Sequence, residues 1–374
     1  MKITFIYDAL YPEVKGGVEK RIYELGKRLA KKHEVHWYTF KWWGDKEIIE
    51  RDGIIVHGIA LPKNLYSGDR RSIREAIDFS FHLLLNRLEK SDIIDCQEFP
   101  YIPCYSTKFH SLLSKSELII TWHEYWGEYW REYIGHSAPF GKFLENNLLK
   151  ITNNHIVVSK LTLANLSKLD SKNFSLIPNG IDLKRIQKVR SHDVKHDAIF
   201  VGRLIKHKNI GFLLRSIKFI RSDYPDFTLG IIGDGPERKK LEKLVKELGI
   251  YNNVEFLGFL DSHEAVIEHI KSSKVLTFPS LREGFGIVVL EANASGIPVV
   301  TVNAPMNASK ELIIPGKNGY ISELNEKSFA EKILLAYENS RKMKRTCINI
   351  ARKYDWDVIA KRLEKYYEGV LSEH

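Results

Sequence analysis

The sequence predicts an α/β protein with two domains, each a doubly wound parallel sheet. Short apolar runs alternate with segments of helical spacing along the chain, as strands and helices do in such folds. Glycine-rich turns follow several of the apolar runs directly. The alternation stops at a Pro-Asn-Gly turn within 176–182 and then starts again. We therefore expect one domain over residues 1–180 and a second over residues 181–355.

The first domain is expected to begin with a buried strand at Lys2–Tyr7, followed by the turn Gly16-Gly17 and a helix over Val18–Lys32. Leu25 and Leu29 lie one turn apart in that helix, which gives it an apolar side. Further strands are expected at 34–40, 92–96, 118–121 and 155–158, and a further helix at 73–88.

After the turn, a polar linker is expected to reach Asp197, and a strand at Ala198–Gly202 restarts the pattern. The remaining expected elements of this domain are strands at 228–233, 254–257, 275–278 and 298–302 and helices at 209–222 and 236–248. The last segment, Trp356–Leu371, has the spacing of an amphipathic helix. Its apolar side comprises Ile359, Leu363, Tyr366, Tyr367 and Val370.

The composition, 44% hydrophobic and 28% charged residues, is typical of a soluble globular protein. No apolar run reaches the roughly 18 residues that a membrane-spanning helix needs, and the N-terminus lacks the apolar core of a secretory signal. Cys96, Cys104 and Cys347 are scattered and odd in number, which indicates a reducing cytosol rather than disulfides or a metal site. We therefore expect a cytoplasmic protein.

The net charge of +10 is spread along the chain without a long block of one sign. It could attract anionic lipid, but it equally suits phosphorylated ligands, and we expect no nucleic-acid partner. Glutamine occurs only as Gln97 and Gln187, whereas Lys, Glu, Ile and Tyr are abundant, which favours a thermophilic source.

The segment 282–292 carries the strongest chemical signal. Glu283 and Glu291 stand eight positions apart and bracket a Gly-Phe-Gly turn and a short apolar run. This pattern predicts a loop that enters the N-terminus of a helix, where backbone N–H groups and the helix dipole bind phosphate. The two carboxylates can accept hydrogen bonds from sugar hydroxyls, so the ligand predicted here is a nucleotide-sugar. An ordinary strand–loop–helix unit with solvated glutamates is the alternative.

Several further motifs of the second half follow one another in a set order. They are Pro178–Asp182, Gly202-Arg203-Leu204 with Lys208, Gly233–Pro236, Phe256–Phe259 and the segment from Glu283 to Glu291. This ordered set resembles the family 4 glycosyltransferases, which are retaining enzymes of the GT-B fold. The resemblance implies two Rossmann-like domains facing across a cleft that binds the substrates. It also implies that the C-terminal helix, about 356–374, crosses back to the N-terminal, acceptor-binding domain.

For the leaving group, the resemblance assigns Arg203 and Lys208 a catalytic role. Two cations stabilise a departing nucleoside diphosphate without a metal ion. Lys206, which lies between them, is more simply a solvated residue. No Asp-x-Asp motif accompanies the sugar-binding loop, so we expect neither a metal nor a cofactor. The substrate would be a UDP-, GDP- or ADP-linked hexose.

For the donor itself, the resemblance implies that Glu291 binds the ribose hydroxyls and that Glu283 binds the transferred sugar. Gly284 and Gly286 would let the backbone approach the phosphates because they lack a Cβ atom. The donor contacts implied besides these come largely from backbone groups: Gly235, Phe259, Leu260, Gly284, Phe285, Gly286 and Ile287.

In the first half, Gly16 and Gly17 would contact the donor phosphate and shape the acceptor pocket, although a plain tight turn explains them equally well. His123 follows a predicted strand, and in the family it would orient the transferred sugar near its reacting carbon. The mechanism implied is front-face substitution with retention. A double displacement would need a carboxylate nucleophile, for which Glu124 could be nominated but is not favoured.

The acceptor is left open as a glycan, a glycolipid, a lipid-linked saccharide or a small molecule. The aromatic run 122–133 could stack on sugar, meet a lipid interface or form a packed corner. The basic helix Glu19–Lys32 could rest on the inner face of the cell membrane, or it could simply be solvated. The alternative functions are those of a nucleotide-sugar epimerase of GT-B fold and of a non-catalytic nucleotide-sugar-binding subunit.

One stretch departs from the family pattern. After Val300 the family has a glycine pair before a Pro-Glu, whereas this chain has Asn303–Glu311 with Glu311 retained and the glycines missing. The backbone of this stretch does not follow from the family pattern, so Asn307 and Ala308 are not included in the predicted site.

Overall fold

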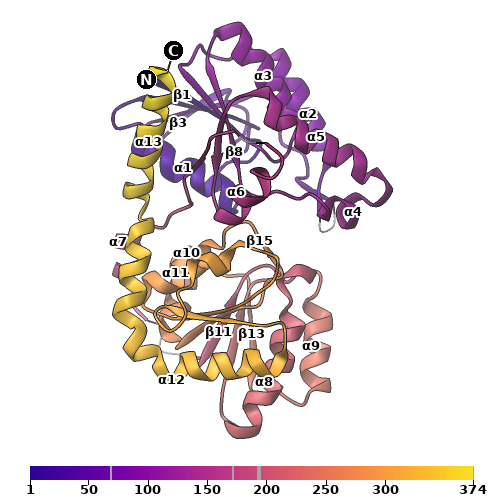
Figure 1. The fold of residues 1–374 in the computed structure, drawn as a ribbon, viewed down its shortest axis with the longest axis vertical. Coiled ribbons are helices and arrows are strands. Elements are labelled where there is room, and N and C mark those ends of the chain that lie inside the picture. Colours follow the sequence, from indigo (N-terminus) through magenta and orange to yellow (C-terminus); the bar gives the residue numbers. More distant parts are fainter. Residues whose placement is uncertain (68–69, 171, 192–194, 374) are drawn as a thin grey trace. The chain divides into compact units, whose positions relative to one another are not determined.

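The computed structural model describes residues 1–67, 70–170, 172–191 and 195–373. The chain forms two compact units, which are taken one at a time below (Figure 1). Unit 1 comprises Met1–Asn179 together with Trp356–His374, and unit 2 comprises Gly180–Asp355. Each is a mixed α/β unit with a largely parallel sheet, as the sequence predicts.

Unit 1 contains an eight-stranded sheet with the order β10-β9-β8-β7-β1-β2-β4-β3, in which only the β3–β4 pair is antiparallel. A two-stranded ribbon, β5–β6, lies outside it. The strands are β1 (Lys2–Ile6), β2 (Glu34–Thr39), β3 (Ile48–Arg51), β4 (Ile54–Gly58), β5 (Tyr66–Ser67), β6 (Arg70–Arg71), β7 (Ile93–Gln97), β8 (Glu117–Trp122), β9 (Asn154–Val157) and β10 (Phe174–Leu176). The helices are α1 (Gly17–Leu29), α2 (Ile73–Leu85), α3 (Ile102–Ser114), α4 (Tyr129–Ile134), α5 (Ala138–Ile151), α6 (Lys160–Leu166) and α13 (Trp356–Ser372).

Alternate residues of the unit 1 strands face opposite sides of the sheet and build two cores. Phe5 and Trp37 belong to one core, which α1 and α13 cover. Ile6 and Tyr38 belong to the other core, under α2, α3 and α5. Because both faces are covered, these strands are apolar on both sides, which explains why they were predictable from apolar runs.

The C-terminal helix α13 packs against α1. Four of the residues predicted for its apolar side, Ile359, Leu363, Tyr367 and Val370, are buried there, and Tyr366 is partly buried. The expected return of the C-terminal helix to the N-terminal domain is therefore confirmed.

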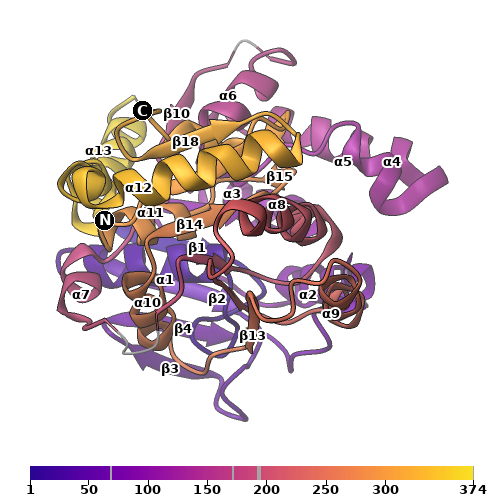
Figure 2. The same cartoon turned by 90° about the horizontal axis from the view of Figure 1, so that it is seen from below.

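Unit 2 contains a six-stranded parallel sheet with the order β13-β12-β11-β14-β16-β18, and the short strands β15 and β17 pair separately. The helices α8, α9 and α12 lie on one side of the sheet, and α10 and α11 lie on the other (Figure 1). Figure 2 shows α12 running beside α8. The strands are β11 (Ala198–Val201), β12 (Leu229–Ile232), β13 (Val254–Gly258), β14 (Val275–Phe278), β15 (Arg282–Glu283), β16 (Val299–Val302), β17 (Met306–Asn307) and β18 (Gly319–Ser322). The helices are α7 (Leu183–Lys188), α8 (Ile210–Asp223), α9 (Arg238–Glu247), α10 (His263–Ser272), α11 (Ile287–Ala294) and α12 (Glu326–Ala351).

The expectation of a polar linker up to Asp197 is wrong in its first part. The helix α7 occupies Leu183–Lys188, and the Asp182 side chain caps it by accepting a hydrogen bond from the Arg185 N–H at 2.9 Å. Residues 192–194 of the expected linker lie outside the described residues. A search of the described helices finds none that is both long and apolar enough to span a bilayer.

Candidate active site

The donor-site residues predicted in the second half all lie in unit 2, in the segments that follow β11, β12, β13 and β14, and Glu291 lies in the helix α11 that follows the last of these. These four strands are neighbours in the sheet, in the order β13-β12-β11-β14. Their carboxyl ends therefore meet at one edge, which is where ligands bind in doubly wound sheets. The topology alone brings the four loops to a common place.

Lys208 and Glu283 are brought into direct contact although they are distant in sequence. The Lys208 Nζ atom pairs with Glu283 Oε1. Both side chains are largely buried, with exposed fractions of 15% and 13%. Lys208 Nζ also lies 5.2 Å from the centre of the Phe278 ring, in cation–π range. Glu283 thus neutralises the lysine at the point where the sequence predicts a diphosphate.

Further positive charge surrounds the same loop. Burial lowers the pKa of His207 to about 3, and the nearby cations Lys208, Arg282 and Arg203 lower it as well. His207 therefore stays neutral at physiological pH. Arg282 is the first residue of the segment 282–292, and the sequence assigned it no role. The structure adds it to the cations of this edge.

Close backbone packing joins the loops after β11, β12 and β13. The Gly233 N–H donates to Gly258 O at 2.8 Å. A Cβ atom on Gly235 would lie 2.5 Å from Leu204 O, so only glycine fits there. Beyond Gly258, Phe259 is exposed and Leu260 is half-buried. The three loops, which carry the predicted donor residues Arg203, Gly235 and Phe259, are therefore packed against one another.

The start of α11 has the geometry of an anion-binding helix N-terminus. Gly286 occupies the cap position with φ at +91°, in the left-handed region. A Cβ atom there would lie 2.6 Å from Ser309 Cβ. Gly286 has no side chain to cap the helix, so the first N–H groups of α11 are available to a ligand. Phe285 is buried, and Gly284 and Ile287 are half-buried.

The segment that departs from the family pattern supports this loop. Its strand β17 pairs with β15 in parallel, with Asn307 opposite Glu283. Asn307 is fully buried, and its Nδ2 donates to Thr301 Oγ1 and to Val302 O, each at 3.0 Å. Asn307 is therefore a structural residue that holds the Glu283 strand in place.

Glu291 lies in α11 and contacts a histidine that sequence reasoning missed. Its Oε1 is 2.7 Å from Nε2 of His263, the first residue of α10. The Glu291 side chain is 9% exposed, so its carboxylate is held rigidly beside the sheet edge. The histidine had no motif to mark it, because its role depends on the packing of α10 on α11.

In unit 1, Gly16 and Gly17 form the start of α1, as predicted, but a side chain occupies this position. A Cβ atom on Gly16 would lie 2.5 Å from Oε1 of Glu19, and Glu19 accepts hydrogen bonds from the backbone of Gly16 and from its own backbone. Burial raises the pKa of Glu19 to about 7. The α1 N-terminus therefore already holds a carboxyl group.

His123 follows β8, at the carboxyl edge of the unit 1 sheet. Its Nε2 donates to Gln97 Oε1 at 2.8 Å, and Gln97 Nε2 donates to Asp95 Oδ1 at 2.9 Å. Tyr367 of α13 donates to Asp95 Oδ2 at 2.6 Å. Burial, and then the neighbouring Arg21, lower the pKa of His123 to about 3. The ring is therefore neutral, which suits orientation of a substrate rather than proton donation.

The aromatic run after His123 forms a packed corner. Trp126 and Trp130 are buried with their ring centres 4.8 Å apart. Buried Glu145 accepts hydrogen bonds from the Trp126 N–H at 2.7 Å and from Trp130 Nε1 at 3.0 Å. The rings of Trp126 and Trp130 pack in the interior of unit 1, so they do not form an open surface for a sugar or a lipid.

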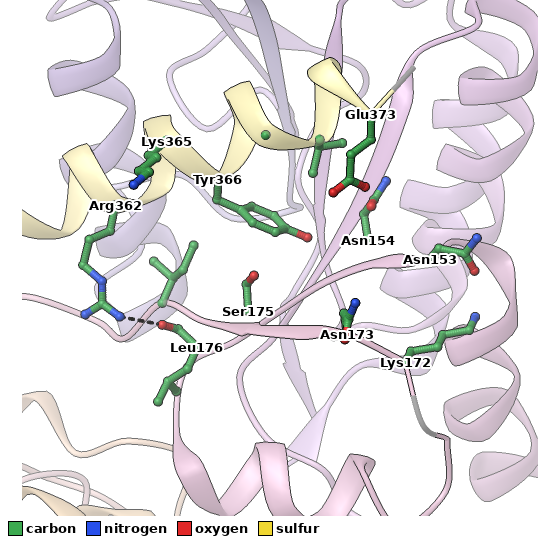
Figure 3. A pocket seen from close by; sticks show the side chains of 13 residues that line it. Asn153, Asn154, Lys172, Asn173, Ser175, Leu176, Arg362, Lys365, Tyr366 and Glu373 are labelled. Carbon is green, nitrogen blue, oxygen red and sulfur yellow. Dashed lines mark hydrogen bonds between the residues drawn. The ribbon is translucent and has the colours of Figure 1, made fainter.

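A cavity of about 790 Å³ lies elsewhere in unit 1, between α13 and the edge strand β10 (Figure 3). Tyr366 and Arg362 line it, and Arg362 Nη2 donates to Leu176 O at 2.8 Å. None of the predicted site residues lines this cavity. The predicted residues are His123, Gly16 and Gly17 in unit 1 and the donor residues in unit 2.

Known protein families match the chain over most of its length. Residues 15–185 match the family described as Glycosyltransferase Family 4, and residues 183–354 match Glycosyl transferases group 1. A human protein named as one subunit of phosphatidylinositol N-acetylglucosaminyltransferase is 26% identical over 99% of this chain and 76% of its own length. An uncharacterised glycosyltransferase of Haemophilus influenzae is 30% identical over 49% of this chain and 43% of its own length.

Among solved structures, sucrose-phosphate synthase from Thermosynechococcus elongatus covers all of this chain and is itself covered fully, with a TM-score of 0.82 and 20% identity. That likeness concerns the fold. The two family models together extend over residues 15–354, across both units. The chain therefore belongs to the group 1, family 4 glycosyltransferases and has the GT-B fold.

Proposed function

We propose that this glycosyltransferase moves a hexose, with retention of configuration, from a nucleoside-diphosphate sugar to a glycan, glycolipid or small acceptor. The observation that carries the proposal is the Lys208–Glu283 ion pair next to the start of α11, whose cap residue is Gly286. One edge of unit 2 thus offers cations, a carboxylate and backbone N–H groups to a single ligand.

The cations of this edge suit a leaving nucleoside diphosphate. Breaking the bond between the anomeric carbon and the phosphate oxygen places negative charge on that oxygen. Lys208, Arg203 and Arg282 around His207 supply positive charge where this happens. A metal ion or cofactor is not needed in this proposal, because side chains and the α11 N-terminus supply the positive potential.

The carboxylates suit the sugar hydroxyls. In the proposal, the diphosphate attracts Lys208, and Glu283 then accepts hydrogen bonds from the transferred hexose. Glu291, held by His263, accepts them from the ribose. The donor nucleotide remains one of UDP, GDP or ADP.

Retention follows from a front-face displacement. The acceptor hydroxyl oxygen bonds to the anomeric carbon on the face from which the phosphate oxygen leaves, and its proton passes to that oxygen. The products are the glycosylated acceptor and the nucleoside diphosphate. His123 is neutral, so its part is to orient the hexose, and no protein nucleophile takes part.

Among these acceptors the proposal favours one that is attached to lipid, which the enzyme would reach by peripheral contact with a membrane. The human relative that matches 99% of this chain is named for an acceptor that is a phospholipid, phosphatidylinositol. A lipid-linked saccharide has the same requirement, since its sugar is displayed at a bilayer surface.

The test is release of nucleoside diphosphate from a panel of nucleotide-sugars, with and without acceptor. Glu291→Ala should weaken donor binding about tenfold or more, since it removes hydrogen bonds to a charged group. Lys208→Ala should mainly lower kcat. Negligible effects of both changes would overturn the proposed site.

The same assay separates the alternatives. Epimerisation of the donor sugar without an acceptor product would favour an epimerase. Donor binding with no turnover in the wild-type protein, under any donor and acceptor, would favour a non-catalytic binding protein.

A further inference from the structure

One flank of unit 1 presents large apolar side chains to solvent. It is built from α2, α3 and α5 (Figure 1). We name it the apolar flank and define it by six exposed residues: Phe81, Leu85, Phe109, Leu112, Leu113 and Phe143. Leu85 and Leu113 are each 69% exposed. A single exposed leucine is ordinary, but several large apolar side chains exposed on neighbouring helices are informative.

The three helices are tied together, so the exposed residues form one surface. Ser80 of α2 hydrogen-bonds Ser106 of α3 at 2.5 Å. Tyr105 of α3 donates to Leu144 O of α5 at 2.8 Å. Helix α3 therefore contacts both α2 and α5, so the exposed residues of the flank lie on neighbouring helices. Contiguous apolar surface of this kind usually marks a site of association.

The flank also has a depression that is lined mainly by apolar atoms. A cavity of about 320 Å³ lies between α3 and α5, with Tyr105, Phe143, Leu144 and Ile151 among its lining residues. Lys150 lines the same cavity. A cation beside an apolar depression matches a phospholipid, whose acyl chain adjoins an anionic headgroup.

The charges on the three helices favour an anionic partner. Arg74 and Lys150 are exposed, and Lys108 is half-exposed. Of the three acidic residues in these helices, Glu75 and Glu145 are buried. The third, Asp78, pairs with Lys63 at 2.6 Å. The surface is thus apolar with a cationic rim, the pattern of elements that lie in the interface of an anionic bilayer.

The basic helix α1 is less suited to this role than its sequence indicated. Arg28 pairs with Asp357 at 2.6 Å, Lys27 with Glu24 at 2.8 Å, and Lys32 with Glu364 at 3.1 Å. Much of its positive charge is therefore neutralised within unit 1.

We propose that the apolar flank docks the enzyme on an anionic lipid bilayer, with its Phe and Leu side chains at the level of the upper acyl chains and its cations at the headgroups. This inference rests on the proposed function, because it gives the surface by which a lipid-attached acceptor would be reached. The docking itself needs neither donor nor acceptor.

The test is co-sedimentation of the full-length protein with vesicles of phosphatidylcholine alone and with added phosphatidylglycerol. The wild type is expected to bind the vesicles that contain phosphatidylglycerol. The triple variant Phe81→Gln, Phe109→Gln and Leu113→Gln should bind them at least about tenfold more weakly, because each change withdraws exposed apolar area from the bilayer. Arg74→Gln with Lys108→Gln should reduce binding and its dependence on salt.

A matched control comes from the other unit. Phe219 of α8 is 49% exposed, as is Phe109, so Phe219→Gln removes the same exposed side chain away from the flank. Phe109→Gln should weaken vesicle binding, and Phe219→Gln should not. Thermal unfolding of each variant checks that the fold is kept.

Several outcomes would overturn the inference: no binding of wild type to either vesicle, equal loss in both single variants, or an unchanged triple variant. Self-association that the triple variant abolishes, without vesicle binding, would assign the flank to a second copy instead. Failure here is distinguishable from failure of the proposed function. Transfer to a soluble acceptor without vesicle binding would overturn only the docking proposal. Vesicle binding without transfer would overturn only the proposed reaction.

Discussion

Nε2 of His123 lies 2.8 Å from Oε1 of Gln97, and this contact sets the tautomer of the histidine. The amide oxygen can only accept, so the proton is on Nε2 and Nδ1 is an acceptor. Gln97 is oriented in turn by Asp95, which also accepts from Tyr367 on α13. The helix at the end of the chain thereby helps to position a residue of the candidate site.

Gln97→Met should lower kcat about fivefold and change KM little. It keeps the size of the side chain but removes its hydrogen bonds to His123 and to Asp95. Loss of the bond that positions His123 is worth about 1 kcal/mol. Tyr367→Phe acts one step further from the ring and should have a smaller effect. Initial rates of nucleoside diphosphate release measure both. Equal kcat in wild type and Gln97→Met would show that the contact only stabilises the fold.

His123 should not titrate in the range of ordinary assays. Its pKa is lowered from 6.5 to about 3, mainly by burial. The unfolded chain takes up the proton at the higher value, so the contribution of neutral His123 to stability is complete above pH 6.5. It falls by at most about 1.4 kcal/mol per pH unit as the pH drops toward 3.

Two measurements check this prediction. Ring NMR shifts of His123, assigned with His123→Gln, should stay constant from pH 8 to about 5. Denaturant unfolding at pH 7 and pH 5 should show a smaller loss of unfolding free energy on acidification in His123→Gln than in wild type. A ring titration near 6.5 would contradict the lowered pKa.

The sequence predicted ten neighbouring strands of the two sheets because these strands appear as continuous apolar runs. It did not predict β3, β4, β10 and β18, which lie toward the sheet edges. Helix α3 gave no such signal. Its outward side carries Phe109, Leu112 and Leu113, so it lacks the polar face that identifies a surface helix. Helix α12 was also omitted, although Phe329, Ile333 and Ala336 have helical spacing and are buried. The signal for α12 was present in the sequence.

The residues of the candidate site also divide into those that the sequence predicted and those that it did not. The motif glycines and Glu283 could be assigned because their loops follow strands whose order the fold fixes. His263 and Gln97 could not be given roles, since each acts through a partner on another element. Arg282 could not either, because its place beside His207 depends on the packing of two loops. The occupation of the α1 N-terminus by Glu19 was also hidden, because a glycine pair before a helix looks the same with or without a side chain folded over it.

Lys208→Ala should destabilise the protein by about 2 kcal/mol as well as lower kcat. It leaves Glu283 unpaired in a largely buried place, and loss of one partner costs more than loss of both. The double variant Lys208→Met with Glu283→Gln should regain stability but not activity. Lys208→Met, Glu283→Gln and the double variant are compared. Chemical denaturation measures the effect on stability, and kcat measures the effect on catalysis.

The control for this cycle is the exposed pair Arg185–Glu264, whose side chains are 51% and 39% exposed. Because water screens such a pair, Arg185→Ala should cost less than about 1 kcal/mol. If Lys208→Ala and Arg185→Ala lowered the free energy of unfolding equally, Lys208 and Glu283 would not form a buried pair.

Gly286→Ala should abolish donor binding and destabilise unit 2. The backbone there has φ at +91°, and the new Cβ would lie 2.6 Å from Ser309 Cβ. The positive φ and the steric contact both disfavour the turn that presents the α11 N–H groups. The positive φ alone costs alanine about 1 kcal/mol. Ser309→Gly in the same chain removes the contact but leaves φ unchanged, so it should restore stability only in part.

Gly369→Ala is the matched control: it lies in α13 with no atom within 4 Å of the added Cβ, and there alanine should stabilise the helix by up to about 1 kcal/mol. Thermal unfolding and titration with nucleotide-sugars compare the three variants. Normal donor affinity in Gly286→Ala would mean that the start of α11 does not hold the diphosphate.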